Sequence, residues 1–245
     1  MNLTIDNKLI VALDVETLAR ARELFNALRD VAGMFKIGSQ LFTAAGPDFV
    51  REIVRAGSRV FLDLKFHDIP NTVAAASREA ARLGVSIFDV HAAGGSEMLK
   101  RTAEAVTEAS EREGLSRPTV IAVTVLTSAD AATLNEIGVN GNPQEQVLKL
   151  AQLAARCGID GVVASPHEVA LLRSAIEREN FVLVAPGVRP IGAAAHDQKR
   201  VMTPGEAVRA GADYLVVGRA ILDAQDPAAA AQKILEEMRE AFETV

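Results

Sequence analysis

Short apolar runs alternate with amphipathic stretches along most of the chain. Eight of these runs have the length of a β-strand and are rich in Val, Ile, Leu or Phe: residues 9–13, 34–37, 60–62, 87–90, 120–125, 161–163, 181–184 and 214–217. Continuous apolar character is typical of parallel strands that are covered by helices on the outer face. The stretches between the runs have helical periodicity, so the pattern predicts repeated βα units.

Four of the helical stretches end on a glycine that is followed within a few residues by the next apolar run. These glycines are Gly57, Gly84, Gly158 and Gly211. Glycine just past a helix supplies the left-handed residue that ends it. Eight such units predict a closed (β/α)8 TIM barrel, and an open doubly wound sheet is the alternative. No Pro-, Gly- or Ser-rich linker divides the chain, so we expect residues 1–245 to form a single domain.

Polar residues collect where the apolar runs end. In a βα barrel the carboxyl ends of the strands form the rim that carries the active site. The residues at or just after these ends are Asp14, Lys36, Asp63, Lys65, His91, Thr127, Ser165 and Gly218.

The segment 63–72 (DLKFHDIPNT) holds the densest cluster of charge at this rim. Asp63 and Lys65 lie at i and i+2, so in a strand they project from the same face, and Asp68 follows closely. Charges beside a buried strand are costly to assemble and point to chemistry. Two neighbouring candidates have ordinary alternatives: Lys36 as a lysine that reaches the surface, and Asp14 as a helix N-cap.

The last two βα loops predict a phosphate site. Arg219 follows Gly218, and the preceding loop runs from Arg189 to Gln198 with the small residues expected of a lid. Glycine lets backbone N–H groups approach an anion, and arginine binds phosphate with two parallel hydrogen bonds. The alternative is that both arginines are merely solvated.

Composition limits the possible partners. The net charge of −6 and the lack of a basic tract argue against nucleic-acid binding, and no apolar run approaches the ~20 residues needed to span a bilayer. The single Cys157 and the lack of a secretory pattern at the N-terminus predict a cytoplasmic protein. His67 and His91 lack the spacing of a metal site, so no metal is expected.

Several motifs together resemble the orotidine 5′-monophosphate decarboxylase family. The ten-residue motif at 63–72 carries most of the resemblance, and it extends in order through residues 11–14 (VALD), 35–38 (FKIG), 90–94 (VHAAG), 123–127 (VTVLT), 186–190 (PGVRP) and 217–219 (VGR). The resemblance implies a homodimeric βα barrel with shared active sites that converts orotidine 5′-monophosphate (OMP) to UMP without a cofactor.

The same resemblance implies a role for each charged residue of the motif. Lys65 would donate a proton to carbon 6 of the pyrimidine, and Asp63 would lie beside the departing carboxylate. Asp68 would reach into the partner subunit's site, where Thr72 also touches ribose. Lys36 and Asp14 would bind ribose hydroxyls and orient the charged array.

At the other end of the substrate, the resemblance implies that Arg189, Gln198, Gly218 and Arg219 hold the phosphate. Thr127 would contact the pyrimidine ring, with Thr124 and Ser128 as close competitors.

Two rival functions follow from the same residues. One is a magnesium-dependent sugar-phosphate decarboxylase or aldolase of the same superfamily, which shares an Asp-x-Lys-x-x-Asp core. The other is a non-catalytic sensor of a phosphorylated ligand, which leaves the charge cluster of Asp63, Lys65 and Asp68 without a purpose. The continuation of the motif at residues 67–72 (HDIPNT) favours the pyrimidine enzyme over the first rival, and the charge cluster argues against the second.

Overall fold

A computed structural model of the chain describes residues 5–190 and 202–243. Its eight strands are all parallel and pair in chain order, and the last returns to the first to close a barrel. They are β1 (Leu9–Ala12), β2 (Met34–Gly38), β3 (Val60–Phe66), β4 (Ile87–His91), β5 (Thr119–Val123), β6 (Gly161–Val163), β7 (Val182–Pro186) and β8 (Tyr214–Val217). The predicted (β/α)8 TIM barrel is confirmed, and the open sheet is excluded.

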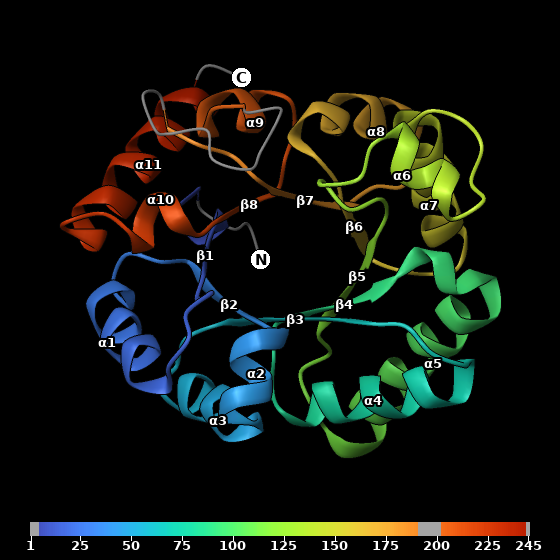
Figure 1. Ribbon diagram of the computed structural model, residues 1–245. Helices are drawn as coiled ribbons and strands as arrows, with labels where there is room; N and C mark the ends of the chain where they lie inside the picture. Colours follow the sequence, from blue (N-terminus) through green and yellow to red (C-terminus); the bar gives the residue numbers. More distant parts are fainter. Residues whose placement is uncertain (1–4, 191–201, 244–245) are drawn as a thin grey trace.

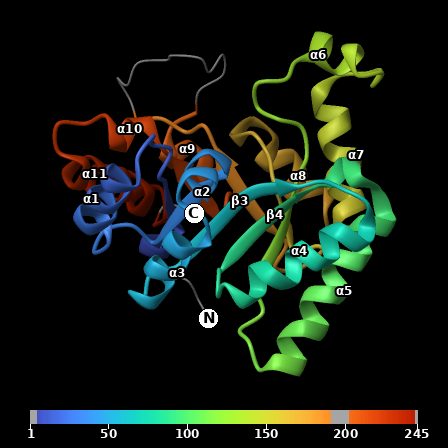
Figure 2. The same ribbon diagram turned by 60° about the horizontal axis from the view of Figure 1, so that its bottom comes forward.

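Helices surround the barrel on all sides (Figure 1). They are α1 (Leu18–Leu28), α2 (Ser39–Ala45), α3 (Pro47–Arg55), α4 (Pro70–Arg82), α5 (Gly95–Glu113), α6 (Ala131–Glu136), α7 (Pro143–Arg156), α8 (Val169–Ala175), α9 (Pro204–Arg209), α10 (Arg219–Leu222) and α11 (Pro227–Phe242), with short 3₁₀ turns at Ile5–Lys8, Ala92–Gly94 and Pro166–Glu168. Figure 2 shows α4 and α5 side by side along the outside of β3 and β4. Within the described residues, no helix is both long enough and apolar enough to cross a membrane.

The glycines that end the helices adopt the backbone conformation the sequence predicts. Gly57, Gly84, Gly158 and Gly211 have φ angles of 83°, 77°, 82° and 101°. Side chains rarely tolerate positive φ, so these positions favour glycine. Each glycine turns the chain from a helix on the outside toward the next strand of the barrel.

Two layers of apolar side chains hold the barrel together. One layer lies between the strands and the helices, and the other fills the inside of the barrel with residues such as Ile10, Phe61, Ile121 and Tyr214. The interior is therefore a packed core rather than a channel. A ligand site must lie above it, at one end of the strands.

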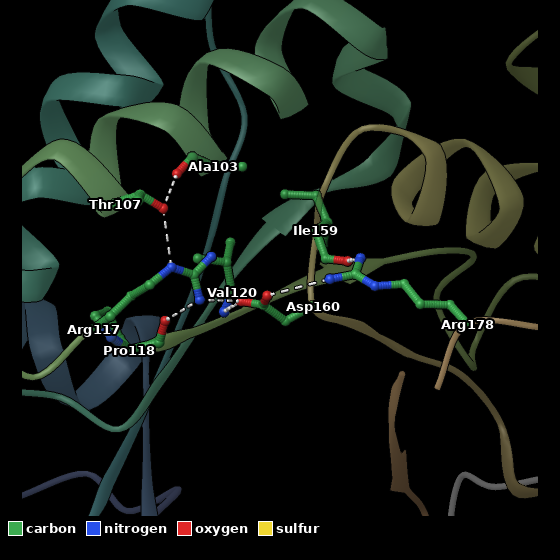
Figure 3. Close-up of polar contacts among 8 residues, drawn as sticks. All are labelled: Ala103, Thr107, Arg117, Pro118, Val120, Ile159, Asp160 and Arg178. Atoms are coloured by element: carbon green, nitrogen blue, oxygen red, sulfur yellow. Dashed lines mark hydrogen bonds and ion pairs between the residues drawn. The ribbon is translucent and has the colours of Figure 1, made fainter. Parts of the chain in front are cut away.

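Ionic contacts cap the amino end of the barrel (Figure 3). Asp160, which directly precedes β6, accepts hydrogen bonds at 2.8 Å from the backbone N–H of Val120 and from Arg117. Asp213, which directly precedes β8, accepts the N–H of Leu183 at 2.8 Å in the same way. At this end of a βα barrel such contacts serve stability, which leaves the carboxyl end for chemistry.

Candidate active site

A cavity of about 500 Å³ opens at the carboxyl ends of the strands. This volume lies within the ~300–1,000 Å³ that is usual for small-molecule sites. Its apolar floor includes Phe61, Val123 and Val216. The polar side chains that line it come from seven of the eight βα units and are Asp14, Lys36, Asp63, Lys65, Asp89, Thr127, Arg189 and Arg219.

Strand β3 is irregular where it carries the charged motif. Leu62 pairs with Phe88 of β4, but the next pair joins Phe66 to Val90, so β3 has extra residues over this stretch. Within it, Lys65 has a φ of 52°, which is rare for a residue with a side chain. Strained backbone of this kind costs about 1–3 kcal/mol and is concentrated at functional sites. The regular alternation that we expected to align Asp63 and Lys65 therefore does not hold at Lys65.

The ammonium of Lys65 nevertheless forms an ion pair with the carboxylate of Asp63. The other oxygen of Asp63 lies 2.9 Å from Nζ of Lys36, which in turn lies 2.9 Å from Oδ1 of Asp14. Four side chains thus form a chain of alternating charge in the order Asp14, Lys36, Asp63, Lys65. Lys36 and Asp63, at the middle of this chain, are each only 8% exposed.

The alternating charges control the ionisation of the two buried members. Burial favours the neutral form of Lys36, but the charges of Asp63 and Asp14 outweigh it and raise the pKa of Lys36. Burial likewise favours neutral Asp63, but Lys36, a hydrogen bond from Asp89 and then Lys65 lower the pKa of Asp63 far below its usual range. Both groups are therefore charged at neutral pH, and the array carries fixed charges of both signs.

Neither ordinary alternative for Lys36 and Asp14 holds. Lys36 does not reach the surface, because its side chain is buried against Asp63. The N-cap of α1 is Thr17, whose side chain accepts the N–H of Arg20, so Asp14 does not cap that helix. Instead Asp14 faces the pocket through its contact with Lys36.

Asp89 is a polar residue of the pocket that the sequence reasoning missed. It lies in the middle of β4, is 0% exposed and accepts the backbone N–H of Lys65 at 2.8 Å. Burial, followed by the charge of Asp63 and a hydrogen bond with it, raises the pKa of Asp89 well above its usual range. The sequence did contain a signal for Asp89, because it is a single acid within the otherwise apolar run 87–90. Lys36 was identified by the same kind of signal, a single charged residue within an apolar run.

The opposite side of the pocket is lined by residues of the predicted phosphate site. Arg189 is buried, Arg219 is exposed at the start of α10, and Gly218 joins β8 to that helix. All three line the cavity. The alternative of a merely solvated arginine thus fails for Arg189, while Gln198 lies outside the described residues.

Among the three candidates for the pyrimidine contact, Thr127 lines the main cavity and Thr124 and Ser128 do not. The hydroxyl of Thr124 donates to the backbone oxygen of Val163 at 2.9 Å. It therefore serves the pairing of β5 with β6.

Asp68 and Thr72 do not line the pocket of their own chain. Both are exposed, and the carboxylate of Asp68 accepts the N–H of Ile69 at 2.6 Å. They flank Ile69, a large apolar residue that is 67% exposed. Their predicted role requires a second chain.

His67 of the motif packs against His91 of β4, with ring centroids 5.3 Å apart and the ring planes tilted by 39°. Burial, followed by the charges of His67 and Lys65, lowers the pKa of His91. In the part of the chain that the structure describes, no three His, Cys, Asp or Glu side chains form a group that could hold a metal ion. That the reaction needs no metal or cofactor stays a prediction.

A closed βα barrel with a charged pocket at the carboxyl ends of its strands has the architecture of the (β/α)8-barrel enzymes. The chain belongs, more narrowly, to the orotidine 5′-phosphate decarboxylase / HUMPS family, whose model matches residues 7–234. The resemblance inferred from the motifs is thereby confirmed.

Individual relatives agree over nearly the whole chain. Orotidine 5′-phosphate decarboxylase of Geobacter sulfurreducens is 57% identical over 231 residues, which cover 94% of this chain and 95% of the relative. The enzyme of the same name from Syntrophotalea carbinolica is 55% identical and covers 96% of both chains. The crystal structure of orotidine 5′-phosphate decarboxylase from Lactobacillus acidophilus has a TM-score of 0.83 and 39% identity, covering 94% of this chain and 98% of that one.

Proposed function

We propose that this chain decarboxylates OMP to UMP in pyrimidine biosynthesis without a cofactor, with Lys65 as the proton donor. Membership of the family and the names of the full-length relatives support the overall reaction. The observation that carries the mechanism is the chain of alternating charge from Asp14 to Lys65 along one wall of the cavity.

The chemical problem of this reaction is a carbanion. Loss of carbon dioxide leaves an electron pair on carbon 6 of the pyrimidine ring, and this carbon must then take a proton. An ammonium group held beside that carbon stabilises the developing negative charge and supplies the proton. Lys65 suits both tasks, because Asp63 holds its ammonium at the pocket wall.

Asp63 would also act on the substrate carboxylate directly. Two carboxylates ~4 Å apart repel each other by about 4 kcal/mol at an effective dielectric constant of ~20. This repulsion disappears as carbon dioxide leaves, so it lowers the barrier only to the extent that binding elsewhere holds the substrate in place. Transition-state stabilisation by Lys65 is the main contribution in this proposal.

The phosphate end of the substrate would supply that binding. Arg189, Arg219 and the backbone at Gly218 line the side of the cavity across from Lys65, and Gln198 is predicted to join them. Thr127 would contact the pyrimidine, and Asp14 with Lys36 would bind the ribose hydroxyls. Remote contacts of this kind hold the reacting carboxylate against the charged wall.

The active unit in this proposal is a homodimer. Asp68 would complete the array of the partner subunit, and Thr72 would touch the ribose bound there. The exposed positions of both residues around the apolar Ile69 support an interface at this edge of the molecule. The expected cytoplasmic location also stays a prediction.

A spectrophotometric assay of OMP conversion in the presence of EDTA tests the reaction and separates it from the rival. We expect undiminished formation of UMP in EDTA, because the oxygens of Asp63 are occupied by Lys36 and Lys65 rather than left for a cation. Activity that EDTA abolishes and magnesium restores would support the magnesium-dependent sugar-phosphate enzyme. Tight binding of UMP without turnover of OMP would support the non-catalytic sensor.

A further inference from the structure

Asp89 is a buried acid that the mechanism above does not use. It belongs to β4, lies next to the irregular stretch of β3, and lines the same cavity as Lys65 and Asp63. An acid that is fully removed from water must be paired or neutralised. The contacts of its two oxygens show how this is achieved.

The first oxygen replaces a missing strand partner. The irregular register leaves the N–H of Lys65 without its regular place in the pairing of β3 with β4, and Oδ1 of Asp89 accepts that N–H at 2.8 Å. This hydrogen bond is made at the one residue of β3 with positive φ. Asp89 therefore fixes the strained backbone from which the side chain of Lys65 extends.

The second oxygen has no donor. Within residues 5–190 and 202–243, no group donates a hydrogen bond to Oδ2 of Asp89, although the atom is buried. The neighbouring acid is Asp63, which lines the same cavity, and the interaction of the two carboxyl groups lowers the pKa of Asp63 and raises the pKa of Asp89. Asp63 already accepts hydrogen bonds from Lys36 and Lys65, so it is ionised and can only accept. A hydrogen bond between the two acids therefore requires a proton on Asp89.

We propose that Asp89 is a positioning residue that acts as a neutral acid, accepting the backbone N–H of Lys65 and donating its own proton to Asp63. It thereby fixes both members of the Lys65–Asp63 pair relative to the pocket. Within one chain this arrangement keeps the array electrically balanced, since Asp14 and Asp63 are matched by Lys36 and Lys65 while Asp89 adds no charge. The inference rests on the proposed function, because it explains how the proton donor is held.

Two substitutions of Asp89 separate position from charge. In Asp89→Asn the amide oxygen accepts the N–H of Lys65 and the amide N–H donates to Asp63, so it reproduces a neutral acid. In Asp89→Ala both hydrogen bonds are lost. Because a misplacement of about 1 Å costs on the order of 10²-fold in rate, we expect kcat to fall about 10²-fold in Asp89→Ala and to stay within about 10-fold of the wild type in Asp89→Asn. The affinity for UMP should change less than about threefold in either variant, since neither removes a predicted ligand contact.

Asp160→Ala is the matched control. Asp160 also accepts a strand N–H at 2.8 Å, but at the amino end of the barrel. Its loss should lower the melting temperature and leave kcat unchanged. If kcat falls in Asp89→Ala but not in Asp160→Ala, the cause is a misplaced Lys65–Asp63 pair and not a general loosening of the barrel.

An infrared difference spectrum tests the neutral acid without any turnover. At pH 7, the spectrum of the wild type minus that of Asp89→Asn should contain the C=O band of a protonated carboxylic acid. The absence of this band would overturn the proposal, as would a fall in kcat for Asp89→Asn as large as that for Asp89→Ala, or an unchanged kcat in Asp89→Ala. If Asp89→Ala does not fold, the infrared band and the kcat of Asp89→Asn decide. A wild-type protein that shows the band but converts no OMP would instead refute the proposed function.

Discussion

Removal of Lys36 is expected to destabilise the protein strongly and in a pH-dependent way. Lys36→Met keeps the length and apolar stem of the side chain but leaves Asp63 with Lys65 as its remaining cation. At the observed 2.9 Å and an effective dielectric constant of ~20, the Lys36–Asp63 attraction is about 6 kcal/mol before the cost of removing both groups from water. Breaking a buried ion pair by deleting one partner costs about 3–5 kcal/mol of folding stability. Because Lys65 still pairs with Asp63 in this variant, we expect a loss near the lower end of this range, about 3 kcal/mol.

The pH dependence follows from the two shifted groups. The pKa of Asp63 is lowered in the folded protein, so its stabilisation is present above the unfolded pKa of about 3.9 and is lost as pH falls toward the folded value. The pKa of Lys36 is raised, so its stabilisation is complete below the unfolded pKa and is lost only at strongly alkaline pH. The difference in the free energy of unfolding between wild type and Lys36→Met should therefore be greatest, and nearly independent of pH, from about pH 5 to 9. It should shrink below about pH 4.

Calorimetry at fixed protein concentration measures this directly. A loss of about 3 kcal/mol corresponds to a fall of ~6–12 °C in melting temperature for a chain of this size. Arg22→Met is the matched control, because Arg22 and Glu52 also approach to 2.7 Å but with side chains that are 50% and 40% exposed. We expect a much smaller effect there, since water screens exposed pairs. Lys36→Met with the wild-type melting temperature at pH 7, or with a loss that persists undiminished at pH 3, would refute the reasoning.

Two further predictions concern binding and the shared site. Arg219→Ala should lower the affinity for UMP about 10-fold in calorimetric titration, which is the lower end of the effect expected for a charge-assisted hydrogen bond, because the side chain is exposed. The affinity for uridine should not change in this variant, and the control Arg51→Ala should bind UMP like the wild type. An equal loss of affinity for uridine would reject a phosphate contact. Mixing inactive Lys65→Ala and Asp68→Ala chains should restore about a quarter of wild-type turnover, because half of the dimers are mixed and each contains one intact site. No recovery after verified exchange of subunits would count against a role for Asp68 across the interface.

The barrel could be predicted from the sequence because its signals are local. Each strand is a short apolar run, and glycines such as Gly57 and Gly158 mark the ends of helices by a backbone conformation that is specific to them. Strand limits were less certain, as the seventh strand shows: the run 181–184 predicted it, and the pairing of Pro186 with Val216 extends it to Pro186. Such limits depend on the neighbouring strand and not on the residue itself.

The site could be predicted only in part, because two of its features depend on other strands. The pattern of alternating faces assumes a regular strand, and the left-handed Lys65 in an irregular register breaks that assumption. Asp89 was missed for the same reason, since its partners become apparent only when β4 lies beside the irregular stretch. Asp68 and Thr72 depend on a second chain, and their roles stay predictions.

The central claim is that the ammonium of Lys65 stabilises and then protonates carbon 6. The most direct test compares wild type and Lys65→Ala in an absorbance assay of OMP conversion, with UMP affinity measured on the same samples. The account predicts that Lys65→Ala loses turnover by several orders of magnitude, as is found when a general acid and its charge are removed together, while UMP binding remains measurable. A variant that binds UMP and retains most of the wild-type rate would contradict it.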